Sequence, residues 1–392
     1  MALTATAVAF AYPSSSPLVP EHDGDDTSWA WLYLWAMVAA FIAYLAGLYL
    51  LDRAGGCLRR RAVIALACVI QLLPLAGPVL LSTDVYTYWD YARISTEHGG
   101  NPYVDEPADY PDDVAYPLMG SRWHETTSVY GPGFTLASEV HASVVGESGD
   151  AAAWLYRGLA AAAMVALALL AARLSDRPAF AAAFVGWNPL LAVHFAGGGH
   201  NDAWMMVFVL AALALAATGR SVLAGVSWAL AITIKWVPLL FLPLRFLEAR
   251  RVGRQVNHWG LAAGVGAIVA IATIRYGLSW FGAAGPLASN LVDDRAKYAI
   301  PSRLASLGLP EGAVAFAFAV AFVVAYAWLL RAAWRGRARL ALTAGLLLVC
   351  TSWLVPWYAV WAVPLAAVEE DRTAQVLALA LSAYLLRVAV PI

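Results

Sequence analysis

The sequence is poor in charge, in lysine and in cysteine. Charged residues make up 13% of the 392 positions, about half of the share typical of soluble domains. This scarcity excludes a soluble globular enzyme and a disordered chain. The net charge of -1 leaves no basic excess to bind a nucleic-acid backbone, so we expect no nucleic-acid partner. The three cysteines lie far apart, which excludes a disulfide framework and a cysteine-ligated metal cluster.

Long apolar runs are what the sequence has in abundance. Hydrophobic residues make up 61% of the chain, and the mean hydropathy is +0.66. A helix needs about 20 mostly apolar residues to cross a bilayer. We therefore expect an all-α polytopic membrane protein, a bundle of roughly 10–12 transmembrane or broken helices. The apolar stretches are residues 29–51, 62–81, 151–172, 178–196, 203–217, 221–247, 259–274, 313–330, 340–368 and 373–390.

The charges are segregated along the chain. Residues 83–150, the acidic loop, carry twelve acidic residues and two arginines, whereas twelve of the 25 basic residues gather in three short segments. The positive-inside rule assigns such basic segments to the cytoplasm. We therefore expect the acidic loop outside, together with an acidic N-terminal tail over residues 1–28. Residues 29–392 are expected to form one transmembrane domain, with the acidic loop as part of its functional site. The basic segments contain Arg53, Arg59, Arg60, Arg61, Arg245, Arg250, Arg251, Arg254, Arg331, Arg335, Arg337 and Arg339.

One apolar stretch fits this orientation only if it is broken. If residues 221–247 crossed the membrane once from the cytoplasmic side, the basic segment at their end would lie outside. Pro238 interrupts the helical hydrogen-bond ladder, so we expect two short helices that form a hairpin with both ends cytoplasmic. Residues 340–368 contain a similar interruption near Pro356-Trp357-Tyr358, where charge does not decide the path.

The acidic loop is too long for a plain connector. It opens on a helical pattern in which Asp84 and Tyr88 share one face, while Tyr86 and Asp90 share another. That pattern suits an amphipathic helix on the outer membrane surface. Asp84 itself has two interpretations. It is either a general base whose pKa is raised by partial burial, or a cap for the start of this helix. A second short helix is expected over residues 134–145.

Lys235 is one of only two lysines in the chain and lies at the break of the predicted hairpin. A charged side chain at membrane depth costs about 2.5–3.5 kcal/mol on insertion scales, so such residues usually serve a function. Lys235 is expected to meet a lipid-linked phosphate or a buried carboxylate. The alternative is a lysine that extends to the interface and anchors the tip of the hairpin.

The segment Gly-Gly-Gly-His-Asn-Asp at residues 197–202 is a second polar element beside apolar stretches. Its glycines allow close approach of the backbone to a ligand, and the helix that follows directs its positive end toward an anion. His200 is a candidate to bind a phosphate or a sugar hydroxyl. The alternative is a polar turn in which Asn201 or Asp202 caps the next helix. A later outer loop, residues 277–312, is surrounded by several cations that break the charge pattern, Arg303 among them, and one of these cations is a candidate to bind an anionic ligand.

Four motifs occur in order along the chain: DVYTY from Asp84, NPY from Asn101, YGP from Tyr130 and GGHND from Gly198. This ordered set resembles the polyprenol-phosphate-mannose-dependent α-1,6-mannosyltransferases of actinobacteria. The resemblance covers roughly residues 81–361 and includes the broken span with Lys235 and the late Pro-Trp-Tyr. The start also resembles the catalytic subunit of GPI mannosyltransferase I, and both belong to the GT-C superfamily of integral-membrane glycosyltransferases.

The resemblance implies a GT-C bundle that transfers a hexose, expected to be mannose, from a polyprenyl-phosphate donor with inversion. Asp84 matches the catalytic aspartate of the family. The eukaryotic relatives have a second acid where this chain has Tyr86, which leaves Asp90 as the candidate second acid. Lys235, His200 and Arg303 are candidates to stabilise the leaving phosphate. A divalent cation, Mg or Mn, could share that role, but the sequence contains no clean ligand cluster.

The resemblance also implies partners and a location. The partners are a polyprenyl-phosphate-mannose donor, a mannan or glycolipid acceptor, and the bilayer of the plasma membrane, with the site facing outside and serving cell-envelope lipoglycan synthesis. The residues expected to bind substrate are Tyr86, Tyr88, Asp90, Asn101, Tyr103, Tyr130, His200, Asn201, Asp202, Lys235, Arg303, Trp357 and Tyr358.

A transporter or flippase for a lipid-linked or small anionic substrate is the alternative function. Broken helices and charges at membrane depth also mark transporters. No inverted repeat is evident in the sequence, and a long acidic and aromatic outer loop is unusual for a carrier. The enzyme is therefore the favoured interpretation.

Overall fold

The apolar stretches fold as helices. The computed structural model describes residues 1–20, 24–53, 60–253, 258–284 and 298–392. Helices account for 73% of the structure, and no β-strand occurs in the described residues. The predicted all-α fold is confirmed.

Four helices are long and apolar enough to cross a bilayer, and a bent pair forms a fifth candidate span. In that pair, α7 (Pro178–Gly186) and the segment Pro189–Gly197 meet at 52°. The bend arises because Asn188 caps the second part and Pro189 occupies its first helical position. The chain is thus a polytopic membrane protein, and the total of 10–12 spanning or broken helices stays a prediction. The four long helices are α2 (Thr27–Arg53), α6 (Gly149–Leu174), α12 (His258–Tyr276) and α15 (Glu311–Trp334).

The shorter helices complete the bundle. Three of them are mainly apolar in composition: α9 (Asp202–Ala217), α10 (Ser221–Ile234) and α16 (Leu340–Cys350). The others are α1 (Ala2–Ala9), α3 (Arg60–Leu72), η1 (Leu73–Ala76), α4 (Asp84–Thr96), η2 (Pro107–Asp109), η3 (Ser121–Trp123), α5 (Pro132–Val145), α8 (Pro189–Ala192), η4 (Val193–Gly197), η5 (Val237–Leu240), α11 (Phe241–Arg251), η6 (Ser279–Ala284), α14 (Ile300–Ala305), η9 (Pro356–Trp361), α17 (Val363–Glu369) and α18 (Arg372–Leu385).

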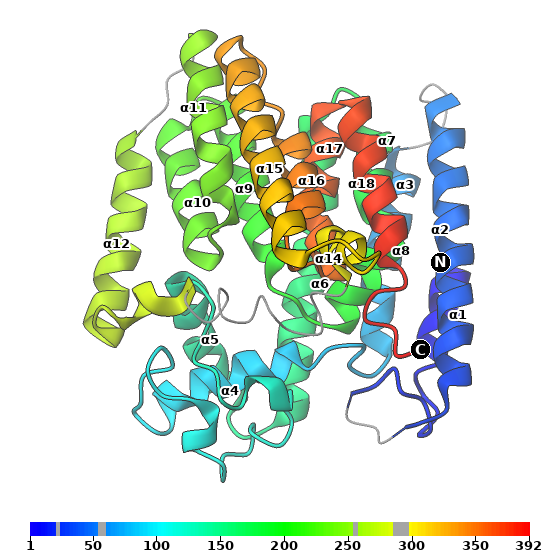
Figure 1. Cartoon of the computed structure of the whole chain (residues 1–392), viewed down its shortest axis with the longest axis vertical. Helices are drawn as coiled ribbons and strands as arrows, with labels where there is room; N and C mark the ends of the chain where they lie inside the picture. The colour runs from blue at the N-terminus through cyan, green and yellow to red at the C-terminus, as the bar shows by residue number, and fades with distance from the viewer. Residues whose placement is uncertain (21–23, 54–59, 254–257, 285–297) are drawn as a thin grey trace.

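The basic segments and the helices of the acidic loop lie at opposite ends of the molecule. The C-terminal ends of α2, α11 and α15, each adjoining a basic segment, are at the upper end in Figure 1, and α4 and α5 are at the lower end. The charge segregation seen in the sequence is therefore also a segregation in space. Of the basic set, Arg59 and Arg254 lie outside the described residues.

The predicted break within residues 221–247 is confirmed. Helix α10 ends at Ile234, and α11 begins at Phe241 after the short turn η5. The two arms run in opposite directions, so that both outer ends of the hairpin lie at the upper end of the molecule in Figure 1. The later stretch is interrupted as well, because α16 ends at Cys350 and η9 begins at Pro356.

Helix α4 does not lie on a membrane surface, in contrast to the amphipathic helix expected from its sequence. All of its residues from Asp84 to Ser95 are buried. The reason is that α4 packs against α5 and α6 and that η2 in the acidic loop covers it further. The predicted second helix of the loop is confirmed as α5.

The N-terminal segment is packed rather than free. Helix α1 contacts α2 and η1, and Ala7 and Val8 are buried. Further along, the backbone N–H of Leu81 donates to the carbonyl of Leu18. The segment therefore supports the chain just before α4 begins.

Candidate active site

A small cavity of about 80 Å³ lies where α4, the 197–202 turn and the hairpin break meet. Two carboxylates, one amide and one ammonium line it, together with seven aromatic side chains. Eight of the residues predicted from sequence are among the lining: Asp84, Tyr88, Tyr130, Asn201, Asp202, Lys235, Trp357 and Tyr358.

Asp84 faces His200 across the wall of this cavity. The two side chains approach to 3.0 Å between His200 Nδ1 and Asp84 Oδ2, and His200 is fully buried. The hydroxyl of Tyr88, one helical turn on, lies 3.4 Å from the same oxygen. Thr83 and not Asp84 occupies the N-cap position of α4. The Asp84 carboxylate is therefore held by side chains at the cavity, as a general base must be.

The ring of His200 is also held by a stacking contact on one of its faces. It stacks on Trp357 with ring centroids 3.6 Å apart and planes 12° from parallel. Gly199 makes this placement possible, because its φ of +70° favours glycine and an added Cβ would lie 2.3 Å from Val85 Cγ1. Gly199 thus serves close packing against α4.

Arg157 anchors the same turn from α6. Its guanidinium donates to the carbonyls of Ala196, Pro74 and Gly77 at 2.7–2.9 Å. The side chain is buried, so its charge is used to satisfy backbone acceptors at the ends of two helical segments. The turn that carries His200 is therefore tied to the rest of the bundle.

Lys235 meets a buried carboxylate, one of the partners expected from the sequence. Its Nζ lies 2.7 Å from Asp202 Oδ1, and the indole Nε1 of Trp361 donates to the same oxygen at 2.6 Å. The ammonium also lies over the ring of Tyr358, 4.8 Å from its centroid. The break in the hairpin thus places a paired positive charge in the cavity wall.

The Tyr-Gly-Pro motif brings the acidic loop against this break. The backbone N–H of Gly131 donates to the carbonyl of Ile234, and an added Cβ on Gly131 would lie 2.2 Å from the carbonyl oxygen of Thr233. Tyr130 packs edge-on against Tyr88 with centroids 5.0 Å apart. Glycine is therefore required for the close approach that positions Tyr130.

Three further predicted residues do not line the cavity, and two of them support its surroundings. The Asn101 amide donates to the carbonyl of Tyr276 and to Ser279 Oγ, and the hydroxyl of Tyr103 lies 3.0 Å from the carbonyl oxygen of Tyr130. Arg303 lies over the ring of Tyr298. The first two join the acidic loop to α12, η6 and the Tyr-Gly-Pro motif.

Tyr86 and Asp90 lie on the face of α4 turned away from the cavity lining. Asp90 is buried near the ion pair between Arg93 and Asp113, whose atoms are 2.8 Å apart. Burial, and next the charge of Asp113, raise the pKa of Asp90 to about 7 against the opposing effect of Arg93. The ordinary value is 3.8, so the folded protein binds this proton more tightly than the unfolded chain does.

The stabilising contribution of this proton is complete below about pH 4 and is lost as the pH rises to about 7. We expect the Asp90→Asn variant to lose that part of the pH dependence. Its melting temperature in detergent should be flatter between about pH 4 and 7 and above that of the wild type at about pH 8. Parallel melting curves for the two proteins across this range contradict the assignment.

Several tryptophans of the site were not predicted. Trp123, Trp236 and Trp353 line the cavity, and Arg122 stacks its guanidinium over Trp353, 4.4 Å from the ring centroid. With 17 tryptophans in the chain, residue type alone gave no way to select these. The sequence indicated them only by their position, since each lies near a predicted motif: Tyr-Gly-Pro, Lys235 and Pro-Trp-Tyr, respectively.

Within the described residues, no group of three or more His, Cys, Asp or Glu side chains is placed to hold a metal ion. Asp84 and Asp202 are the two carboxylates of the cavity lining, and Asp202 already pairs with Lys235. A divalent cation therefore stays a hypothesis.

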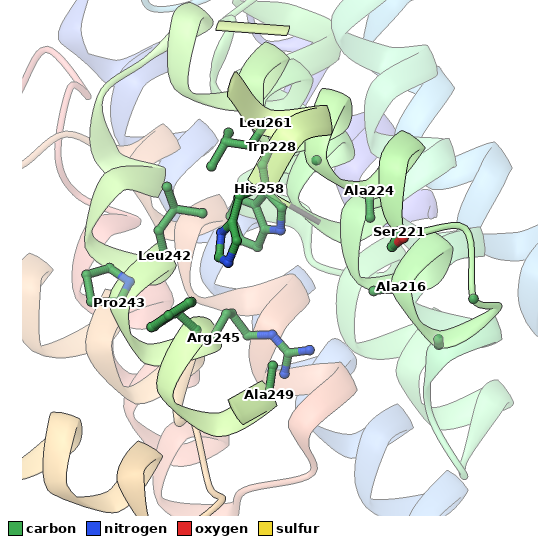
Figure 2. Close-up of a pocket in the computed structure, with 14 residues that line it drawn as sticks. Ala216, Ser221, Ala224, Trp228, Leu242, Pro243, Arg245, Ala249, His258 and Leu261 are labelled. Atoms are coloured by element: carbon green, nitrogen blue, oxygen red, sulfur yellow. The ribbon is translucent and has the colours of Figure 1, made fainter. Parts of the chain in front are cut away.

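A second, larger cavity of about 780 Å³ separates the two arms of the hairpin. Figure 2 shows its apolar wall, with Trp228 on α10, Leu242 on α11, and Arg245 and His258 among the lining side chains. Its described lining contains no carboxylate and none of the residues predicted from sequence to bind substrate. The smaller cavity with Asp84 is the candidate active site.

Comparison with known proteins assigns this arrangement to a family. Residues 3–250 match the family model described as alpha-(1->6)-mannopyranosyltransferase, N-terminal domain. The chain is 30% identical over 234 residues to alpha-(1->6)-mannopyranosyltransferase A of Mycobacterium tuberculosis, which covers 54% of this chain and 44% of that protein. It is 27% identical over 181 residues to alpha-(1->6)-mannopyranosyltransferase A of Corynebacterium glutamicum, covering 45% and 36% respectively. The matches thus span less than half the length of these curated relatives, and no solved structure matches the chain significantly.

Proposed function

Since the chain belongs to the alpha-(1->6)-mannopyranosyltransferase family, we propose that it transfers a mannosyl group from a polyprenyl-phosphate donor to a glycan or glycolipid acceptor. The observation that carries the proposal is the Asp84–His200 pair at a cavity that also holds Asn201, Asp202 and Lys235. The seven aromatic side chains of the lining suit the apolar faces of a sugar ring.

The proposed reaction proceeds with inversion at the anomeric carbon. The carboxylate of Asp84 takes the proton of the acceptor hydroxyl, while that oxygen forms the new bond to the anomeric carbon. The bond from this carbon to the phosphate oxygen breaks, and its electron pair leaves with the polyprenyl phosphate. His200 holds the Asp84 carboxylate in place through its 3.0 Å contact, so the base does not need to be reoriented during the reaction.

The leaving phosphate gains negative charge and needs a positive neighbour. Lys235 is already paired with Asp202, and Arg303 does not line the cavity. Arg122 does not line the cavity, but its guanidinium lies over the rings of Trp353 and Trp123, which do. We assign Arg122 and Lys235 together to the stabilisation of the leaving group.

The proposed location is the plasma membrane, with the cavity at its outer face. The end of the molecule that carries the acidic loop lies opposite the ends that adjoin the basic segments (Figure 1). The positive-inside rule places those basic segments in the cytoplasm. A lipid-linked donor then reaches the cavity by lateral diffusion within the outer leaflet.

A transfer assay tests the proposal. The purified protein is supplied with polyprenyl-phosphate-[¹⁴C]mannose and an α-mannoside acceptor, and the linkage of the product is determined by NMR. We expect labelled product with this donor and none with GDP-mannose. Flux of the lipid-linked sugar across liposomes without any transfer contradicts the proposal and favours the transporter.

A further inference from the structure

Three polar atoms of the cavity residues Asn201 and Asp202 have no hydrogen-bond partner in the described part of the protein. They are Oδ1 and Nδ2 of Asn201 and Oδ2 of Asp202. The two residues are 1% and 0% exposed. Buried polar groups in native proteins are nearly always bonded, so a missing partner at all three atoms indicates a ligand.

The remaining contacts of Asp202 fix the direction of its free oxygen. Oδ1 accepts from Lys235 at 2.7 Å and from Trp361 at 2.6 Å, which leaves Oδ2 as an acceptor beside the cavity. Asn201 is the preceding residue and also lines the cavity. Its amide supplies one acceptor and two donor hydrogens.

This set of atoms selects among ligand chemistries. A carboxylate oxygen without a donor repels a phosphate and accepts from a hydroxyl. An amide that can donate and accept complements a second hydroxyl on the neighbouring carbon. The rings of Trp357 and Tyr358 lie in the same lining and offer apolar surface to a sugar.

We propose that Asn201 and Asp202 form a subsite that binds two neighbouring hydroxyl groups of a hexose. Oδ2 of Asp202 accepts from one hydroxyl, and the amide of Asn201 bonds the other. This inference rests on the proposed function, because it gives the sugar of that reaction its specificity contacts. The hexose is the ring of the donor or that of the acceptor, and the two are separated by the experiment below.

The test pairs an Asn201→Ala variant with deoxy sugars. The wild type is assayed with polyprenyl-phosphate-mannose and its 2-, 3-, 4- and 6-deoxy forms, and separately with acceptors that lack one hydroxyl other than the hydroxyl that receives the sugar. We expect kcat/KM of the wild type to fall at least about 100-fold at two neighbouring positions of one ring. At one of these positions, Asn201→Ala should show no further loss relative to its own value with the parent sugar. The proposal is overturned if, for every deoxy analogue of both rings, the loss of kcat/KM from the missing hydroxyl and the loss from Asn201→Ala multiply.

A structural role for Asn201 is separated by stability. Because its amide has no partner in the described protein, Asn201→Ala should leave the melting temperature of the ligand-free protein unchanged. A marked drop indicates that the amide supports the fold and contradicts the subsite. Gly158→Ala, on α6 with no atom near the added Cβ, serves as the control variant.

Failure of the proposed function is distinguishable from failure of the subsite. If the wild type transfers no sugar, binding is measured by the shift of the melting temperature with polyprenyl-phosphate-mannose and with methyl α-mannoside. A shift in the wild type that is lost in Asn201→Ala supports the subsite even without transfer. Equal shifts in both proteins, or no shift with either probe, overturn it.

Discussion

Replacing Asp84 with asparagine is expected to lower kcat for mannosyl transfer about 10³-fold. The asparagine keeps the size of the side chain and an oxygen that can accept from His200, so the contact at 3.0 Å has a replacement. What is lost is the basic oxygen that takes the proton of the acceptor hydroxyl. Initial rates with saturating donor and acceptor measure the effect.

Glu97→Gln is the matched control for Asp84→Asn. Glu97 follows the last residue of α4 and is exposed, so its loss of charge should change kcat by less than about twofold. Equal turnover in wild type and Asp84→Asn rules out Asp84 as the general base. An unchanged melting temperature in both variants shows that activity and not folding was altered.

Replacing Lys235 with methionine is expected to destabilise the protein by about 3–5 kcal/mol. The substitution leaves the fully buried carboxylate of Asp202 with the indole of Trp361 as its remaining donor. A buried charge without a partner destabilises a protein by more free energy than the intact ion pair contributes to stability. Chemical denaturation in detergent micelles measures the change, and transfer activity should be lost as well.

A second substitution tests this explanation. In the double variant Lys235→Met with Asp202→Asn, both charges are removed and the asparagine oxygen can still accept from Trp361. Stability should return to near that of the wild type, while activity should stay low because the hydroxyl acceptor of Asp202 is gone. A double variant as unstable as Lys235→Met shows that packing and not charge explains the loss.

The features of the site that depend on local pattern could be predicted from sequence. The break before Pro238 followed from the proline and from the basic residues after it. A buried carboxylate was one of the two partners expected for Lys235. Asp84 and His200 were each selected as site residues, but their contact was not predicted. Polar residues inside apolar stretches are costly in a membrane, so their number is small and their positions are informative. The all-α class followed from the number and length of the apolar stretches.

What could not be predicted depends on contacts between distant segments. The helical period showed that Tyr86 and Asp90 share a face of α4, but not that other segments cover both faces of this helix. Likewise, nothing in the sequence placed Trp123 and Trp353 in the same cavity. Arg303 was selected by charge alone, and it lies over Tyr298 instead.

The wide spacing of the cavity residues along the chain has a consequence for biosynthesis. Trp361 follows Asp202 by 159 residues, which corresponds to on the order of ten seconds of translation. During that interval, α4 and α9 have been made, but the tryptophans that complete the cavity wall have not. A ribosome-bound chain at this stage therefore contains both carboxylates of the cavity, but not the indole of Trp361 that donates to Asp202. The described cavity lining is therefore complete only once Trp353, Trp357 and Tyr358 have been made.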